Sequence, residues 1–279
     1  MSAVVRFSIA PVLSLALEHP TEIELTERGV AEDRRFYLID DDDRLVDRLV
    51  VGALVQVRAH TDPAATTLRL ELPDGMAIEG DVSLGQAVET PIYSRTGVGH
   101  LVEGPWAEAL GPIAGRRVRV VRCDRVGGTR RGNSASLVSQ GSLDELARQA
   151  GVGDIDARRF RMLIELDGAT PHEEDDWIGG RIALGEAVLR VTARDGRCAI
   201  TTQHPDTGAR DLDTLRAIVR YRGVMPDRFG APKAMFGVLA DVEQPGRVRL
   251  GDEVRVLDSE PRGSRTPLVR PLIGLGGSV

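Results

Sequence analysis

The sequence predicts a mainly β protein, a sandwich or barrel with a few short helices. Three observations lead to this prediction. Short apolar segments recur along the first hundred residues, and Pro, Asp or Gly bounds each of them, as in sandwiches and barrels. The 31 Gly and 15 Pro among 279 residues favour many turns and short strands. Helix signals are confined to three short segments.

The expected strands are the short segments 23–26, 35–39, 54–57, 68–72, 117–122 and 187–194, of which 23–26 alternates clearly. The first expected helix is 105–110, ended by Gly111. The second begins with a capping box formed by Ser142 and Glu145 and ends at Gly151. The third begins at Asp211 and ends at Gly223.

Composition excludes several classes of function. Hydrophobic residues make up 42% and charged residues 28% of the chain, as in a folded globular protein. The net charge of −6 and the aromatic content of 4% argue against binding to nucleic acid. No apolar run reaches the roughly 18 residues of a membrane span, so no membrane partner is expected.

Two cysteines, Cys123 and Cys198, are too few for a disulfide scaffold. We interpret both as free thiols in a reducing compartment. The apolar stretch 9–17 is interrupted by Pro11 and Ser14, unlike a signal peptide, and we therefore expect a cytoplasmic protein.

Cys198 lies in the segment with the strongest chemical signal. The strand expected over 187–194 leads into it, and Arg194 and Arg197 flank it. Neighbouring cations favour the thiolate, which is the nucleophilic and metal-binding form of cysteine. The alternative is a buried structural cysteine beside the turn 205–208, and Cys123 has the same two interpretations, of which the structural one is favoured.

Three further clusters carry charge or hydroxyl groups. Seven arginines fall within 116–131, and a loop of short polar side chains, 132–136, follows them and can offer amides and hydroxyls to a phosphate. Three more arginines surround Phe160. The acidic run 173–176 offers paired carboxylates for acid–base chemistry, but a solvated turn is favoured. A third interpretation is that Glu174 and Asp175 are partners for the arginines.

Taken together, these segments resemble the MOSC family, the domain found at the C-terminus of molybdenum cofactor sulfurases. Within it, the chain is most similar to the two-part proteins such as the amidoxime reducing component. The matching blocks are Asp33-Arg34-Arg35-Phe36, Ser134-Ala135-Ser136, Arg158-Arg159-Phe160-Arg161, and Arg197-Cys198 with Thr201-Thr202 and 205–208. Met162 and Leu163 stand where the family has Pro-Asn.

The resemblance implies a MOSC-type β-barrel preceded by a smaller β-rich domain. The expected boundaries are 1–112 for the N-terminal domain, 113–258 for the barrel and 259–279 for a C-terminal tail. It also implies the molybdenum cofactor, Mo-molybdopterin; pyridoxal phosphate is not expected. Cys198 is then the Mo ligand, or the sulfur acceptor in sulfur-carrying members. The candidate cofactor-binding residues are Arg34, Asn133, Ser134, Ser136, Arg159, Arg161, Arg197, Thr201 and Thr202.

Two functional hypotheses follow from the resemblance. The first is an oxidoreductase that reduces N-hydroxylated small molecules and is reduced again by a separate electron-donor protein. His204 and Asp206 are candidate proton donors because they are near Cys198 in the sequence. The second is a carrier of sulfur or of the cofactor that holds a persulfide on Cys198 without redox turnover.

Overall fold

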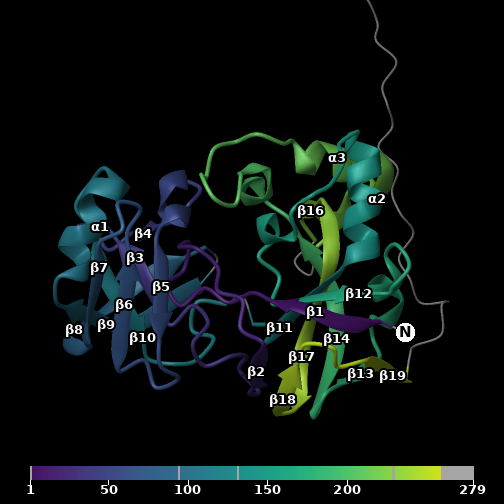
Figure 1. The fold of residues 1–279 in the computed structure, drawn as a ribbon, viewed down its shortest axis with the longest axis horizontal. Coiled ribbons are helices and arrows are strands. Elements are labelled where there is room, and N and C mark those ends of the chain that lie inside the picture. Colours follow the sequence, from purple (N-terminus) through teal and green to yellow (C-terminus); the bar gives the residue numbers. More distant parts are fainter. Residues whose placement is uncertain (1, 94, 131, 228–229, 259–279) are drawn as a thin grey trace, which may run out of the picture.

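The computed structural model describes residues 2–93, 95–130, 132–227 and 230–258. Strands account for 43% of the structure and helices for 18%, which confirms the mainly β prediction. Figure 1 shows two β units side by side, one containing β3 to β10 and the other containing β11 to β19. No helix within these ranges is long and apolar enough to cross a membrane.

The larger unit is built on a curled seven-stranded sheet. Its strands, in spatial order, are β1 (Ala3–Phe7), β12 (Ile164–Asp167), β11 (Ala135–Ser139), β17 (Met235–Gln244), β14 (Ala187–Gly196), β13 (Arg181–Leu184) and β19 (Val254–Asp258). All neighbours are antiparallel except β11 and β12. Two further ladders pair β18 (Gly246–Arg249) with β2 (Glu22–Leu25), and β15 (Met225–Pro226) with β16 (Pro232–Lys233).

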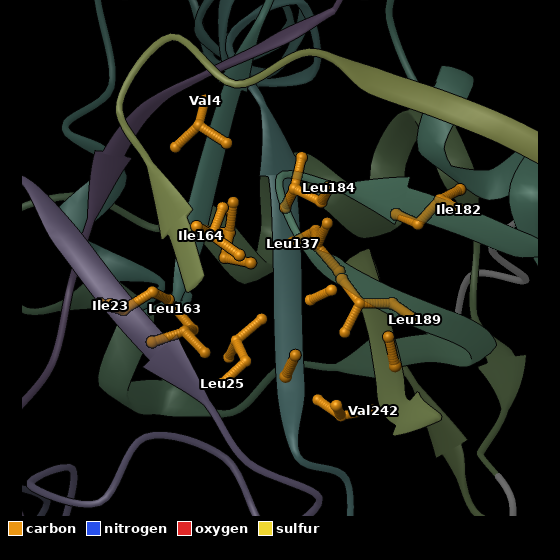
Figure 2. Packing of buried hydrophobic residues seen from close by; sticks show 14 of the residues in the cluster. Val4, Ile23, Leu25, Leu137, Leu163, Ile164, Ile182, Leu184, Leu189 and Val242 are labelled. Carbon is orange, nitrogen blue, oxygen red and sulfur yellow. The ribbon is translucent and has the colours of Figure 1, made fainter. Parts of the chain in front are cut away.

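Alternation in these strands directs one set of side chains into a shared apolar core. Leu137 of β11, Leu189 of β14 and Val242 of β17 meet there with Ile23 and Leu25 of β2 (Figure 2). Burial of such aliphatic side chains stabilises the fold by about 1.5–3 kcal/mol each. This core supports the strand β14 that leads to Cys198.

The smaller unit has its own core. Its five-stranded sheet has the order β4 (Leu45–Val46), β3 (Phe36–Ile39), β10 (Arg119–Cys123), β9 (Arg95–Glu103) and β8 (Ser83–Ile92). A second sheet contains β5 (Arg58–Thr61), β6 (Thr67–Glu71) and β7 (Ala77–Asp81). Trp106 is buried among these strands, and its indole N–H donates to the Leu68 carbonyl at 3.0 Å.

The chain passes between the two units more than once. β1 and β2 come from the N-terminus yet pair with β12 and β18 of the larger unit. β10 follows residue 112 yet pairs with β3 and β9 of the smaller unit. The boundary at residue 112 stays a prediction, and the tail 259–279 lies outside the described residues.

The helices differ from the prediction at their ends. The first, α1 (Trp106–Ala114), continues through Gly111 and Pro112 and ends at Gly115 in the left-handed conformation. The third, α3 (Thr214–Arg222), begins after Asp213, whose carboxylate caps it, and not at Asp211, which is paired with Arg159. The predicted ends at Gly151 and Gly223 are confirmed.

Two local predictions are wrong. The second helix, α2 (Gln140–Ala150), is capped by Ser139, which accepts from the Ser142 amide at 3.2 Å. Ser142 is therefore inside the helix, and its hydroxyl donates to buried Glu174 at 2.7 Å. The segment expected as a strand at 54–57 lies mostly in a 3-10 helix, η1 (Gly52–Gln56).

The remaining 3-10 helices carry most of the clusters singled out in the sequence. They are η2 (Ala157–Arg159), η3 (Glu173–Trp177) and η4 (Ala199–Thr202). In η3, Glu174 and Asp175 are buried, so the acidic run is not a solvated turn. Asp175 pairs with arginines as the alternative expected, whereas Glu174 bonds to serine hydroxyls instead.

Candidate functional site

A cavity of about 420 Å³ lies where the two units meet, and both contribute to its walls. The smaller unit and its connections supply Ser14, Arg34, Arg48 and Tyr93. The larger unit supplies Ser136, the segment 159–161, the segment 193–198 and Thr201. Segments far apart in the sequence therefore share one site.

Cys198 lies at this cavity with an exposed side chain. β14 ends at Gly196, and Cys198 is then the N-cap of η4. The Thr201 hydroxyl contacts the Cys198 carbonyl at 3.1 Å and the Thr214 hydroxyl at 2.7 Å, so it joins the cysteine segment to α3. An exposed sulfur held on a fixed backbone is suited to bind a ligand.

The two cysteines have opposite environments. Cys123 ends β10 and is fully buried, and this burial raises the pKa of its thiol to about 12. The structural interpretation of Cys123 is therefore confirmed. Cys198 is exposed beside a cavity, which overturns the structural interpretation of that residue.

The arginines next to Cys198 in sequence are engaged elsewhere. The buried guanidinium of Arg197 donates to the Phe236 carbonyl at 2.8 and 2.5 Å, to the Phe160 carbonyl at 3.2 Å and to the Met162 sulfur at 2.7 Å. Arg194 donates to Asp175 at 2.9 Å. Both residues line the cavity, but their polar groups fasten strands and loops together.

Other arginines of the cavity share carboxylate partners. Arg159 binds Asp211 through two hydrogen bonds of 2.7 Å. Arg34 and Arg130 both pair with the single carboxylate of Asp33, which is fully buried. Burial opposes ionisation of Asp33, but the two arginines and the Ala10 amide outweigh it and lower its pKa.

Two arginines of the cavity have no carboxylate partner among the described residues, Arg48 and Arg161. Arg161 donates to the Leu15 carbonyl at 2.8 Å. Burial, together with the charges of Arg48 and Arg34, holds the pKa of Arg161 well below its ordinary value. In a chain of net charge −6, this wall is a local positive field that favours an anion.

Backbone strain is concentrated at the same place. Seven non-glycine residues in the described ranges have positive φ, and four of them line the cavity: Ser14, Arg34, Tyr93 and Arg161. Such conformations cost of order 1–3 kcal/mol and occur preferentially at ligand sites. The strain at Arg34 and Arg161 therefore supports a binding role independently of their charge.

Most of the predicted cofactor-binding residues meet at the cavity, whereas four of the predicted site residues lie outside its lining: Ser134, Thr202, His204 and Asp206. Ser134 donates to the Glu27 carbonyl at 2.5 Å. Asp206 is paired with Arg158, and its own amide donates to the His204 ring at 3.2 Å. The structure thus places both predicted proton donors in the turn beyond the cysteine segment, and their catalytic role stays a prediction.

Three small polar side chains of the prediction do line the cavity, Asn133, Ser136 and Thr201. The Ser136 hydroxyl accepts from the Leu163 amide at 3.0 Å. The Asn133 amide donates to Thr192 at 2.9 Å and to Asp241 at 3.1 Å. Each of the three is thus fixed in place by the larger unit.

Arg48 was missed by reasoning from the sequence. It follows β4 and precedes η1, in a segment with neither a motif nor a basic cluster. Gln203, which is five residues beyond Cys198, holds it in place across the two units. Nearby, the backbones of Gly52 and Gly208 approach so closely that neither position has room for a Cβ.

Comparison with known proteins identifies one domain within the chain. The model of the MOSC domain matches residues 125–255. These residues form a MOSC domain. It contains Cys198, Arg161 and the greater part of the seven-stranded sheet.

Curated relatives align over part of the chain. The mouse mitochondrial amidoxime-reducing component 1 is 30% identical over 124 residues, 43% of this chain and 36% of that protein. The human mitochondrial amidoxime reducing component 2 is 35% identical over 101 residues, 34% of this chain and 29% of its own length. A molybdenum cofactor sulfurase of rice is 29% identical over 120 residues, 38% of this chain and 13% of that protein. The chain thus spans about a third or less of the length of these relatives.

Among solved structures, the YUAD protein from Bacillus subtilis is similar to the chain with a TM-score of 0.45 and 15% identity. The match covers 92% of this chain and 96% of that protein.

Proposed function

We propose that this protein binds the molybdenum cofactor and reduces N-hydroxylated small molecules. One observation carries the proposal: an exposed thiol, Cys198, shares a cavity with Arg34 and with Arg161, which has no carboxylate partner among the described residues. Mo-molybdopterin has a metal at one end and a phosphate at the other, so it needs both a thiolate and cations. The MOSC domain and its amidoxime-reducing relatives support this choice of ligand.

The residues present fit such a cofactor. A metal that brings its own dithiolene ligands needs only one protein thiolate, and Cys198 can supply it. Within the described ranges, no cluster of three or more His, Cys, Asp or Glu side chains forms a separate metal site. Arg161 lines the cavity with no carboxylate partner among the described residues, and its guanidinium is suited to a phosphate.

Different residues of the cavity would bind the two ends of the cofactor. Cys198 would bind the metal, while Arg34 and Arg161 would hold the phosphate through charge-assisted hydrogen bonds worth about 1.5–3 kcal/mol each. Thr201 positions the cysteine segment through the Cys198 carbonyl. When bound, the cofactor would supply the two electrons that, with two protons, convert N–OH into amine and water.

The electrons would come from a separate donor protein. A reducing, cytoplasmic setting suits an exposed thiol, because oxidation to a disulfide or sulfenic acid would remove the ligand.

The carrier function is the alternative, and the exposure of Cys198 favours it as well. A persulfide on an accessible thiol can be handed to another protein, and the rice relative is a molybdenum cofactor sulfurase. In this case the chain would hold sulfur or the cofactor without redox turnover.

Elemental analysis separates the two proposals. The protein is produced in a host that synthesises the cofactor and is assayed for Mo, for pterin fluorescence and for persulfide by mass spectrometry. One Mo and one pterin per chain, together with turnover of a hydroxylamine, supports the reductase. A persulfide on Cys198 without Mo supports the carrier and overturns the reductase.

A further inference from the structure

The cavity contains one buried cation with no role in the proposal so far, Arg48. Its side chain is 1% exposed. The guanidinium Nε donates to Oε1 of Gln203 at 2.9 Å, and Nε2 of Gln203 donates back to the Arg48 carbonyl at 2.7 Å. These two bonds orient the arginine across the junction of the two units.

The far end of the same guanidinium is unpartnered. Nη1 and Nη2 are both buried without a hydrogen bond among the described residues. Asp47 is adjacent in sequence, but its carboxylate accepts from the Leu49 amide at 2.9 Å and from the Tyr93 hydroxyl at 3.0 Å. Arg159 lines the same cavity as a like charge and is itself bound to Asp211.

The buried guanidinium of Arg48 needs a negatively charged partner. Burial lowers the pKa of Arg48 to about 10, which still leaves it protonated at neutral pH. A buried cation without a counter-charge is destabilising by several kcal/mol, because burial removes its water. No ion pair joins Arg48 to a carboxylate among the described residues, so a negatively charged ligand group in the cavity is the natural partner.

The position of Arg48 indicates which ligand supplies this group. Two arginines of the cavity have no carboxylate partner among the described residues, and the proposed function assigns one of them, Arg161, with Arg34, to the phosphate of the cofactor. Gln203, which binds Arg48, is the C-cap of η4, and Cys198 is the N-cap of the same short helix. Arg48 is therefore held against the cysteine segment, where the reacting bond of a substrate would lie.

We infer that Arg48 receives an anionic group of the substrate, and that the protein therefore acts on small N-hydroxylated compounds bearing a carboxylate or a similar oxyanion. The N-hydroxyl group of this substrate comes from the proposed function, so that part of the inference rests on it. The anion site at Arg48 is independent of the proposed function. Gln203 acts as a positioning residue, since it fixes the guanidinium without facing the anion.

The first test uses the protein without cofactor. Thermal unfolding is followed with increasing sodium acetate, and acetamide at equal concentration is the neutral control. We expect acetate to stabilise the wild type and Arg48→Lys, but not Arg48→Met. Arg161→Met is the matched control, and it should keep the response to acetate while losing most of its response to inorganic phosphate.

A second readout excludes a trivial loss of structure. Arg48→Met removes a buried charge that lacks a counter-charge, so its melting temperature in acetate-free buffer should equal or exceed that of the wild type. A lower melting temperature combined with an unchanged acetate response would overturn the inference, because Arg48 would then serve the structure alone.

The last test uses the loaded enzyme and a pair of substrates, a hydroxylamine with a carboxylate and its neutral methyl ester. Arg48→Met should raise KM for the acid by about 10- to 100-fold, in proportion to one lost charge-assisted hydrogen bond. It should leave kcat, the ester and the Mo content nearly unchanged. Equal losses for acid and ester, or loss of Mo as in Arg161→Met, would overturn the inference and make Arg48 a cofactor ligand.

Absence of Mo from the wild type would refute the proposed reductase, while the acetate titration would still decide the anion site.

Discussion

Cys123 and Cys198 show how differently the two units treat the same kind of side chain. Both follow an alternating strand and both have arginines close by in the sequence. Cys123 is the last residue of β10 and points into the core of the smaller unit with Tyr37 and Ile39. Cys198 comes two residues after the end of β14, where the chain has left the sheet and turned toward the cavity.

The difference shows that a cysteine is buried or exposed according to whether it lies within its strand or beyond the end of the strand. The neighbouring residues in the sequence do not decide this. Gly99 pairs with Cys123 in the β9–β10 ladder, which keeps that residue in the sheet. Beyond the end of β14, the Arg197 guanidinium donates to the Phe236 carbonyl, and the side chain of the next residue, Cys198, is exposed.

The largest expected effect comes from replacing Cys198, the exposed one of the two cysteines. Cys198→Ala should abolish Mo-dependent activity and leave the melting temperature nearly unchanged, because an exposed side chain contributes little packing. Activity and bound Mo are measured together. Cys123→Ala is the matched control, with full activity per folded molecule and a loss of about 1 kcal/mol in unfolding free energy. Full activity with bound Mo in Cys198→Ala would show that another group binds the metal.

The second effect is a difference between the alkylation rates of the two thiols. Iodoacetamide at neutral pH should alkylate Cys198 at least about 100-fold faster than Cys123 in the native protein, since the thiolate is the reactive form and burial raises the pKa of Cys123 to about 12. Peptide mass spectrometry gives both rates in one experiment. Unfolding in urea should remove the difference, and persistence of the difference there would point to a cause other than burial.

The third effect concerns the cavity beside Cys198. Arg161→Ala should lower cofactor occupancy by about tenfold or more, the loss of one charge-assisted contact. It should not lower the melting temperature of the cofactor-free protein by a comparable amount, because burial and like charges already disfavour the charged form. Pterin fluorescence reports occupancy. Unchanged occupancy would remove Arg161 from the proposed phosphate site.

The smallest expected effect is on pH stability. The pKa of Asp33 is lowered in the folded state, so this carboxylate stabilises the protein above its unfolded pKa, and that contribution is lost as the pH falls through the folded value. Asp33→Asn should therefore flatten the decline of unfolding free energy below about pH 4. Urea unfolding between pH 3 and 7 measures the slope. The mutant should also be less stable at pH 7, and an unchanged slope would contradict a native ion pair.

Local sequence patterns were sufficient for the mainly β class and for several members of the site. Alternation predicts β2, β6, β10 and β14 because a half-buried strand requires it at short range, whereas β3 is a short apolar run buried on both faces. The thiol at Cys198 and the arginines at Arg34, Arg159 and Arg161 were recognised from motifs that are contiguous in the chain. The helix ends were less secure. Ser139 and Ser142 have equivalent hydroxyls, and only the buried carboxylate of Glu174, more than 30 residues away, distinguishes them.

Tertiary structure decided which charges remain for a ligand. Every arginine near Cys198 looks equally available in the sequence, yet Asp175, Asp211 and Asp33 neutralise some of them and leave Arg161. Arg48 enters the site only because Gln203, 155 positions further along the chain, holds it there. Such pairings depend on how two β units pack together, and electrostatic energy depends on distance and burial in space. For that reason the sequence by itself determined most of the strands, the cysteine segment and the expectation of a positive site. The packing of the two units determined the exposure of Cys198 and which arginines stay free for an anion.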